Sequence, residues 1–506
     1  MKNISVLLET EGTYPFVDGG VSTWCDILCH ELPQVDFYIC AITGDPYVAT
    51  KYNIPPNVKQ IIHVPLWGAE EPAEYVLEDV PFSTIFKKKV NTTDSIIEEK
   101  FLPVFRELLH GMAESDMHIE FYGQMIHRMY HYFKEYDYKD TLRSELVWRA
   151  FKDEMLLNYV DRPQGYNEDE WPSMFDITTC MRWLFNFLMP LNVSIPRTDI
   201  SHATIAASVG LLGIIAKIEH GTPIIATDHG VYIRERYIAV GSADLTFFSK
   251  KFMTEFSAFV TKLNYLYADQ ISPVCNFNQR WELRWGATEA KVRTIYNGVD
   301  PDIFVPGEKS ERTRDRPTVV AAARVFPLKD ILTMIRSAAV VRESIPNVKY
   351  IVFGSLKADP KYVEECRSLI KELNLDDTFE LAGFHSNPAQ IFNEGDISIL
   401  SSISEGFPYT VLESMSCATP VVGTDVGGVR EALEGFGIVV KPKDPEALAE
   451  GVIRLLSDDE LRQRLGRMAR EEVLAKFRTS YSVSGYWETY QQLAETRGRI
   501  EKKECL

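Results

Sequence analysis

Two glutamates eight positions apart, Glu405 and Glu413, have the side chains and the setting for binding chemistry. Glu405 falls in a predicted loop and Glu413 on a predicted helix, between predicted strands at residues 397–400 and 420–423. A glycine-containing loop between a strand and a helix start can hold an anion, because free backbone N–H groups and the helix dipole point at one place. Ionised carboxylates beside that place are strong acceptors for the hydroxyls of a sugar or a ribose. The alternative is two surface glutamates around an ordinary helix start.

Two cations, Arg324 and Lys329, follow directly on another predicted strand, residues 318–322, in the segment AAARVFPLKD. An arginine offers a planar fork of donors and a lysine a mobile point charge, so the pair suits two linked phosphates. Fixed cations of this kind stabilise the charge that develops on a leaving diphosphate, as a divalent metal would. The alternative is two solvated charges at a helix start, but cations there oppose the helix dipole. The segment therefore favours an anionic ligand.

A family resemblance follows from these motifs and from two further phrases. The segment EGFPYTVLE, which spans Glu405 and Glu413, resembles the donor-site signature of the retaining GT-B glycosyltransferases of family 4. In the N-terminal half of the chain, EGTYPFVDGGVSTW and ATDHGVYIRER are similar to phrases of the PelF-like glycosyltransferases, the soluble enzymes of Pel polysaccharide synthesis. The resemblance covers nearly all of the chain. The C-terminal motifs are general to family 4, and the two N-terminal phrases are the specific part.

The resemblance implies a fold and an activity. The fold is GT-B, in which two Rossmann-like, doubly wound α/β domains face each other across a cleft, with a helical insertion in the N-terminal domain. The activity is the retaining transfer of a hexose, with glucose expected, from a UDP-sugar to a growing polysaccharide or another glycan acceptor. No metal and no cofactor besides the UDP-sugar donor is implied. A front-face displacement needs no side-chain nucleophile, which agrees with a sequence that shows no Ser-His-Asp set.

The resemblance also assigns roles to individual residues. Arg324 and Lys329 would neutralise the diphosphate, and Glu413 would accept hydrogen bonds from the ribose hydroxyls. Glu405 would hold hydroxyls of the transferred sugar. The remaining donor contacts are glycines and aromatic residues: Gly19 and Gly20 against the phosphates and sugar, Gly354 near the nucleotide, Phe384 beside the base, and backbone N–H groups of Gly406 and Phe407 near the sugar.

Two histidines are candidates for the reaction centre. His202, in DISHATIAAS, is predicted to follow a strand and to open a helix that faces the cleft, and His229 lies in the TDHG phrase. Many family 4 enzymes carry a second histidine two positions after the first, where this chain has Thr204. A single histidine is more often a structural hydrogen-bonding group than a catalyst, and both interpretations stay open for each of the two. Arg234 and Arg236 beside His229 either face the cleft or form structural ion pairs.

Composition and charge exclude several other functions. The 506 residues suffice for two or three domains, and the net charge of -18 argues against nucleic acid and against broad docking on anionic lipid. The eight cysteines form no C-x-x-C pair, and Cys25 and Cys29 are neighbours on one predicted helix, so we expect buried free thiols in a reducing compartment. Neither a signal peptide nor a membrane-spanning stretch is predicted. We expect a cytoplasmic protein, and an association with a membrane-bound polysaccharide export complex stays open.

Alternating apolar strands and helical patterns predict two doubly wound domains. Residues 1–305 form the expected acceptor-side domain, with a helical insertion at about 66–196, and residues 317–479 form the nucleotide-sugar domain. Residues 480–506 are a predicted helix that crosses back to the first domain, and the charged segment at 307–316 is a predicted exposed connection. The predicted strands are 4–8, 35–41, 58–64, 223–227 and 294–296 in the first domain, and 318–322, 349–353, 378–381, 397–400, 420–423 and 437–440 in the second.

Two other patterns are interpreted as structural. His127 and His131 have the i, i+4 spacing of a shared metal site, but no carboxylate occupies the usual intervening place, and the aromatic surroundings favour packing. Asp300 and Asp302 form a D-x-D string that is better explained as a turn at the exit from the first domain. The rival functions are a glycogen- or starch-synthase-like transferase with an ADP-sugar, a sugar-nucleotide 2-epimerase, and a non-catalytic regulator that binds nucleotide sugars.

Overall fold

The computed structural model describes residues 3–67, 80–113, 119–160 and 171–504. The chain forms two compact units, each with its own parallel sheet. Parts of the predicted insertion, at 68–79, 114–118 and 161–170, lie outside the described residues. Unit 1 comprises Met1–Pro273, Gln279–Arg293 and Trp487–Leu506, and unit 2 comprises Val274–Asn278 and Thr294–Tyr486.

The sheet of unit 1 has six parallel strands in the order β3-β2-β1-β4-β5-β6. This is the Rossmann order, and the direction of winding reverses between β1 and β4. Val6, Leu7 and Leu8 of β1 are fully buried, as expected for a parallel strand that is covered on both faces. The strands are β1 (Ile4–Glu11), β2 (Val35–Thr43), β3 (Val58–Pro65), β4 (Ile200–Ala203), β5 (Ile224–Asp228) and β6 (Gln270–Pro273).

The predicted strand at 294–296 is wrong. Its place at the sheet edge is taken by β6, and the chain after Val292 leaves the sheet. The aromatic ring of Tyr296 instead packs on Phe407 and Phe477 of unit 2, with ring centroids 5.1 and 5.3 Å apart. The apolar run that suggested a strand therefore serves the core of the other unit.

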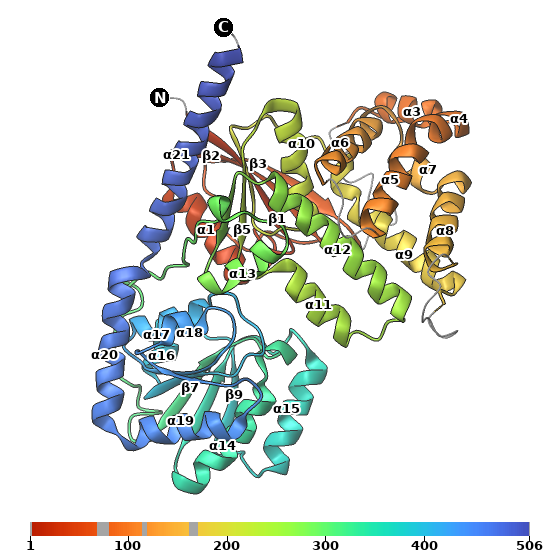
Figure 1. The fold of residues 1–506 in the computed structure, drawn as a ribbon. Helices are drawn as coiled ribbons and strands as arrows, with labels where there is room; N and C mark the ends of the chain where they lie inside the picture. The colour runs from red at the N-terminus through yellow and green to blue at the C-terminus, as the bar shows by residue number, and fades with distance from the viewer. Residues whose placement is uncertain (1–2, 68–79, 114–118, 161–170, 505–506) are drawn as a thin grey trace. The chain divides into compact units, whose positions relative to one another are not determined.

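The helices of the predicted insertion bury a continuous aromatic and methionine core. Phe101 stacks on Phe105, and Met125 and Met129 are fully buried. Helix α6 packs against α10 and α12, which belong to the Rossmann-like part of unit 1 (Figure 1). The insertion helices are α3 (Phe82–Asn91), α4 (Asp94–Ile96), α5 (Leu102–Ala113), α6 (Ile119–Glu135), α7 (Tyr138–Leu142), α8 (Glu145–Val160) and α9 (Met174–Phe187). The other helices of unit 1 are α1 (Gly20–Glu31), α10 (Leu211–His220), α11 (Tyr232–Ser242) and α12 (Phe247–Tyr267), and α13 (Asn276–Arg284) contributes to both units.

The sheet of unit 2 repeats the same winding, in the order β12-β11-β10-β7-β8-β9, so its reversal lies between β7 and β10. Alternate residues of β7 enter two cores: Val320 packs with residues of α16 and α17, and Val319 and Ala321 with residues of α14 and α15. All six predicted strands are present: β7, β8 and β10 have the predicted ends, and the ends of β9, β11 and β12 differ by at most two residues. They are β7 (Thr318–Ala322), β8 (Lys349–Phe353), β9 (Phe379–Gly383), β10 (Ile397–Leu400), β11 (Val421–Thr424) and β12 (Ile438–Val440).

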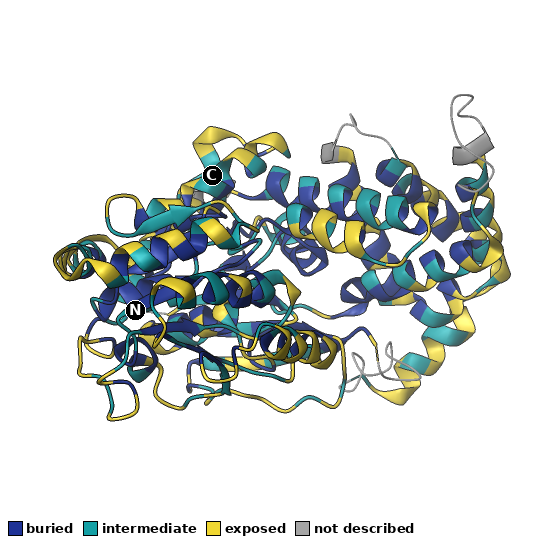
Figure 2. Ribbon diagram, turned by 90° about the horizontal axis from the view of Figure 1, so that it is seen from below, coloured by how far each residue is buried: buried dark blue, intermediate teal, exposed yellow. Residues whose placement is uncertain are grey.

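Helices cover this second sheet on both faces, and most of the strand length is dark blue in Figure 2 because it is buried. The prediction of two doubly wound α/β sheets with a helical insertion in the first is thus confirmed. The helices of unit 2 are α14 (Ile331–Ser344), α15 (Pro360–Glu372), α16 (Pro388–Asn393), α17 (Tyr409–Ser416), α18 (Val429–Leu433), α19 (Pro445–Ser457) and α20 (Asp459–Lys476).

The segment at 307–316 is not a free connection. Lys309 Nζ lies 2.8 Å from Asp396 Oδ2, and Thr313, which is buried, donates to Glu394 Oε2 over 2.5 Å. The segment therefore belongs to unit 2 and does not connect the two units, although Glu308, Glu311, Arg314 and Asp315 are exposed as predicted.

The last helix, α21 (Thr479–Glu504), begins in unit 2, and its residues from Trp487 onward belong to unit 1. Tyr490 is fully buried there, and Arg497 Nη1 donates to the Thr198 carbonyl over 2.7 Å. These contacts fix the C-terminal part of the helix on unit 1.

The cysteines agree with the prediction of buried free thiols. All seven that the structure describes are free and buried, with Cys25 and Cys29 both on α1, and Cys505 lies outside the described residues. Among the described helices, none combines the length and the apolar character that a membrane crossing requires.

Candidate functional site

The candidate site of unit 2 lies at the carboxyl ends of β7 and β10, the two strands that flank the winding reversal. Ligands of doubly wound sheets bind at this position, because the loops after the two strands diverge and leave room. Arg324 and the short helical turn Pro327–Lys329 follow β7, and the loop with Glu405 follows β10. The sheet topology thus brings together groups that are 76 positions apart in sequence.

Lys329 and Glu405 form an ion pair, with Nζ 2.5 Å from Oε1. Ser402 Oγ donates to the same carboxylate oxygen over 2.6 Å. The loops are also joined directly, because Ile403 N donates to the Leu328 carbonyl over 2.9 Å. The exposed fractions of the Lys329 and Glu405 side chains are only 21% and 11%. Among the described residues none bonds to Glu405 Oε2, so this oxygen can accept from a ligand hydroxyl.

Arg324 is the exposed cation of this site. Its guanidinium lies 5.1 Å from the ring centroid of Phe326 and makes no hydrogen bond or ion pair with any residue of the described part of the chain. The loop beyond it is fixed by Asp330, which has a left-handed backbone conformation (φ 48°) and caps α14 through a hydrogen bond from Thr333 N. A solvent-facing guanidinium on a fixed loop is a suitable anion contact.

Glu413 lies on α17 and is partly buried. Burial raises the pKa of its carboxyl to about 7. No described residue forms a hydrogen bond or an ion pair with this carboxyl, although buried carboxyls normally have such partners. A carboxyl whose pKa is raised by burial and which has no described partner is a candidate for ligand contact.

The start of α17 offers backbone donors. The N-cap residue, Pro408, has no side-chain acceptor, so no side-chain cap bonds the first backbone N–H groups of the helix. The backbone N–H groups of Gly406 and Phe407 donate to none of the residues that the structure describes. The Phe407 ring is buried and packs on Tyr296 and Phe477, so only its backbone is available to a ligand.

The glycine turn of the GTDVGG segment positions this loop. Gly427 has a left-handed backbone conformation (φ 56°), and a Cβ atom there would lie 2.1 Å from the Glu405 carbonyl oxygen. Gly428 N donates to the Gly406 carbonyl over 2.7 Å. The two glycines thus allow the chain after β11 to lie directly against the Glu405 loop, which explains their presence without any ligand.

Gly354 has a similar structural reason. Its φ is 151°, and a Cβ atom there would lie 2.0 Å from the Ala323 carbonyl oxygen. The glycine therefore allows the end of β8 to approach the backbone just before Arg324, and its contact with a nucleotide stays a prediction. Phe384 follows Gly383 and is 84% exposed, so its ring is free for the predicted contact with a base.

In unit 1, Gly19 and Gly20 join β1 to α1. Gly19 is the N-cap in extended backbone, a conformation that any residue adopts, and a Cβ atom there would meet nothing within 4 Å. Neither conformation nor packing therefore requires glycine at this position. The start of α1 has no side-chain cap and is open to an approaching ligand.

The structure gives His202 a structural role. It lies within β4 and does not open a helix, and it is fully buried. Nδ1 is 2.7 Å from Tyr490 Oη and Nε2 is 2.7 Å from Thr227 Oγ1, so both ring nitrogens are occupied. Burial lowers the pKa of the imidazole to about 3. A neutral ring held on both sides has no free nitrogen for catalysis.

His229, directly after β5, differs in one respect. Its Nε2 atom is buried and has no partner among the described residues, while its ring packs edge-on against Trp24 with centroids 4.7 Å apart. Burial lowers the pKa of this imidazole to about 3 as well, so the ring is neutral. His229 therefore has one buried nitrogen without a described partner, and its contact with a ligand stays a prediction.

The arginines beside His229 are partly buried. The Arg236 guanidinium lies 5.3 Å from the Tyr232 ring centroid, and its Nε has no partner in the described part of the chain. Arg234 takes part in contacts of its own. Neither side chain is a free surface charge.

Sequence reasoning missed the buried carboxyls at the end of β1. Glu9 accepts from Ser201 Oγ over 2.9 Å, its Oε2 has no described partner, and burial raises its pKa to about 8. Burial also raises the pKa of Glu11, whose Oε2 is likewise without a described partner and whose charge is offset by Arg236. The available signal was the phrase ETEG at a strand end, where a doubly wound sheet binds its ligands.

Comparison with known families matches both parts of the chain. Residues 4–290 match the family described as "Domain of unknown function (DUF3492)", and residues 307–472 match "Glycosyl transferases group 1". The N-acetyl-alpha-D-glucosaminyl L-malate synthase of Bacillus anthracis is 25% identical over 207 residues, 39% of this chain and 53% of that protein. The D-inositol 3-phosphate glycosyltransferase of Corynebacterium jeikeium is 27% identical over 237 residues, 43% of this chain and 56% of that protein. The chain spans about half the length of the curated relatives it matches.

Solved structures establish the fold class. The sucrose-phosphate synthase of Thermosynechococcus elongatus superposes with a TM-score of 0.61 at 17% identity and covers 98% of this chain and 100% of its own. The Anabaena protein HepE, solved with UDP and glucose, gives a TM-score of 0.57 at 14% identity and covers 96% of this chain and 99% of its own. The predicted GT-B fold is confirmed.

Proposed function

We propose, on the premise that the chain belongs to the DUF3492 family and carries a group 1 glycosyl transferase domain, that it transfers a hexose from a nucleotide sugar to a glycan acceptor. The anomeric configuration is retained. The expected donor is UDP-glucose, the expected acceptor is a growing exopolysaccharide as in the PelF-like enzymes, and the transfer requires no metal ion.

One observation carries this proposal: a cation pair and a carboxylate share the strand ends of unit 2. Arg324 is exposed and Lys329 contacts Glu405 over 2.5 Å. A nucleotide sugar has a diphosphate joined directly to a sugar. Its binding site therefore needs cations for the diphosphate and, beside them, a group that accepts hydrogen bonds from the sugar hydroxyls. The Lys329–Glu405 contact supplies both.

The transfer itself follows from these groups. The bond between the anomeric carbon and the phosphate oxygen breaks, and a bond to the acceptor oxygen forms on the same face of the sugar. The acceptor proton passes to the leaving phosphate oxygen. Arg324 and Lys329 stabilise the negative charge on the diphosphate, and Glu405 holds hydroxyls of the sugar as its ring gains positive charge. No side-chain nucleophile is needed.

Ribose recognition is assigned to Glu413. Its unpartnered carboxyl accepts from the ribose hydroxyls, which are common to UDP, ADP and GDP donors, so it does not select the base. The choice of UDP rests on the sequence phrases similar to PelF-like enzymes and on HepE, the structural relative that was solved with UDP and glucose. The name of the Bacillus anthracis relative makes UDP-N-acetylglucosamine the first alternative donor to compare.

A donor panel tests the proposal. Calorimetry with UDP, ADP and GDP identifies the nucleotide, and nucleotide release from UDP-glucose, UDP-N-acetylglucosamine and ADP-glucose identifies the donor. We expect tightest binding of UDP, turnover of UDP-glucose, and an α-linked product by NMR. Preference for ADP-glucose would favour a glycogen-synthase-like enzyme. Binding without turnover of any donor would favour a regulator, and inversion at carbon 2 would favour an epimerase.

A further inference from the structure

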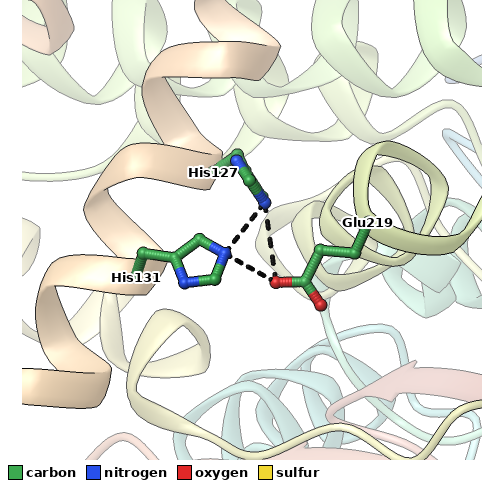
Figure 3. A group of neighbouring side chains, drawn as sticks. All are labelled: His127, His131 and Glu219. Carbon is green, nitrogen blue, oxygen red and sulfur yellow. Dashed lines mark hydrogen bonds and ion pairs between the residues drawn. The ribbon is translucent and has the colours of Figure 1, made fainter.

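Three side chains in unit 1 converge at a point that the proposed transfer does not use. His127 and His131 lie on α6, and Glu219 lies on α10. The two Nε2 atoms are 3.0 Å apart, and Glu219 Oε1 lies 2.9 Å from His131 Nε2 and 3.5 Å from His127 Nε2 (Figure 3). The sequence interpretation of the two histidines as packing residues missed this carboxylate, because it comes from another helix.

The triangle of ligand atoms has the dimensions of a metal site. Zn²⁺ binds histidine nitrogen and carboxylate oxygen at about 2.0–2.2 Å in tetrahedral geometry, which places neighbouring ligand atoms roughly 3.3–3.6 Å apart. The three observed separations, 2.9, 3.0 and 3.5 Å, approach one face of such a tetrahedron. Both histidines present the same nitrogen, Nε2, to the centre, as two ligands one helical turn apart do.

The surroundings suit an ion that enters from solvent. The side chains of His127 and Glu219 are 21% and 19% exposed, so packing holds them in place. The side chain of His131 is 55% exposed, so the triangle is open to solvent on its side. The second carboxylate oxygen of Glu219 lies 3.5 Å from His220 Nε2, which orients the carboxylate from outside the triangle. Such outer contacts fix the ligands of metal sites.

Another histidine of unit 1 shows what a simple pair looks like. His110 Nε2 lies 3.5 Å from Glu154 Oε2 and joins no group of three possible ligands among the described residues. Between α6 and α10, by contrast, two imidazole nitrogens and one carboxylate oxygen face one another, and each of the three atoms can coordinate a metal ion. Protons on the two Nε2 atoms can satisfy at most two of the three edges of the triangle, whereas one cation satisfies all three atoms.

We propose that His127, His131 and Glu219 bind one divalent transition-metal ion, foremost Zn²⁺, with water at the fourth position. The ion fastens α6 of the insertion to α10, which packs on the sheet of unit 1. Two imidazole ligands with one carboxylate suit Zn²⁺ and Co²⁺ better than Mg²⁺ or Ca²⁺, which take oxygen ligands. The site shares no residue with the strand-end site of unit 2 and has a structural role.

Metal titration of tag-free, chelator-treated protein tests the site. We expect one equivalent of Zn²⁺ by calorimetry, and Co²⁺ should give the intense visible absorption of tetrahedral coordination. Zn²⁺ should also raise the melting temperature. Glu219→Gln should weaken Zn²⁺ binding more than about 10-fold, and His127→Ala/His131→Ala should abolish the Co²⁺ spectrum. His110→Ala, which removes a histidine from a simple pair, should change none of these results.

The variants separate a built site from chance binding. Glu219→Gln keeps the shape of the side chain and His131 is largely exposed, and circular dichroism confirms that each variant is folded. Zn²⁺ or Co²⁺ binding that survives in the double histidine variant would overturn the proposal. So would wild-type protein that takes up no stoichiometric Zn²⁺. Neither outcome depends on turnover of a sugar donor.

Discussion

Lys329 Nζ lies 2.5 Å from Glu405 Oε1, and this contact joins the loop after β7 to the loop after β10. The proposed roles of the two residues are therefore coupled. Without donor, each charge neutralises the other. On the proposed function, the ion pair holds both side chains in place until a donor binds, when Lys329 would contact the diphosphate and Glu405 the sugar hydroxyls.

Arg324→Ala should weaken UDP binding without loss of folding. The guanidinium is exposed and makes no hydrogen bond with the described residues, so its removal leaves no buried group unpaired. Loss of one charge-assisted contact to phosphate costs about 1.5–3 kcal/mol, or roughly 10–150-fold in Kd. Calorimetry with UDP measures the effect. Arg367→Ala, on the surface of α15, is the matched control and should bind UDP as wild type. Equal affinities for the two variants would remove Arg324 from the diphosphate site.

UDP affinity should depend on pH through Glu413. Burial raises the pKa of this carboxyl from 4.5 to about 7, and its ionised form accepts more strongly from ribose hydroxyls. The affinity of wild type for UDP, divided by that of Glu413→Gln, should therefore rise between pH 6 and 8 and then level. The titration of the UDP phosphates affects both proteins equally, so it does not change this ratio. A ratio that stays constant over this range would contradict the ribose assignment.

Stability should show the opposite trend at the same residue. A carboxyl whose pKa is higher in the folded state holds its proton more tightly there than in the unfolded chain. Its contribution to the free energy of unfolding is therefore complete below the unfolded pKa of 4.5 and is lost as pH rises through the folded pKa of about 7. The melting temperature of wild type should fall relative to Glu413→Gln between pH 5 and 8. Parallel melting curves across this range would show that the carboxyl is solvated.

His202 and His229 should fail in different ways. His202→Ala removes a ring whose two nitrogens bond Tyr490 and Thr227, so it should lower the free energy of unfolding by about 2–4 kcal/mol. His229→Gln removes a nitrogen without a described partner, so it should keep the melting temperature while turnover falls by about 10-fold or more. Thermal melts and UDP release compare the two. Full turnover by a stable His229→Gln variant would show that His229 does not serve the reaction centre.

Donor turnover should continue after chelator treatment, because Arg324 and Lys329 supply the positive charge that a metal would otherwise supply. UDP release is measured with and without chelator. The chelator also removes an ion from the site proposed on α6 and α10, so the assay is run well below the melting temperature of the chelated protein. Loss of turnover in folded protein, with recovery on addition of Mg²⁺ or Mn²⁺, would contradict this prediction.

The sheet of unit 2 could be predicted because its strands are short, continuous apolar runs between helical patterns. Val319, Val320 and Ala321 enter cores on both faces, so consecutive positions of the strand are apolar and no polar face alternates with them. The same rule wrongly predicted a strand at Tyr296. An apolar run indicates that a segment is buried, but it does not indicate which core the segment joins.

The candidate site could be predicted only as separate motifs. Lys329 and Glu405 were recognised by their places after strands, but their contact depends on the pairing of β7 with β10. The structural role of His202 depends on Tyr490, 288 positions away, and the third member of the metal triangle lies on another helix. Spacing rules describe neighbours along one element, and these partners come from different elements.

The most direct test of the account is the Glu405→Gln variant, with UDP affinity and UDP-glucose turnover measured on the same preparation. The substitution nearly preserves the shape of the side chain and releases Lys329 from its ion pair. UDP affinity should stay the same or increase, while turnover falls by about 10²-fold or more, because the lost charge acts on the sugar only as the bond to phosphate breaks. Full turnover by Glu405→Gln, or a loss of UDP affinity as large as the loss of turnover, would contradict the account.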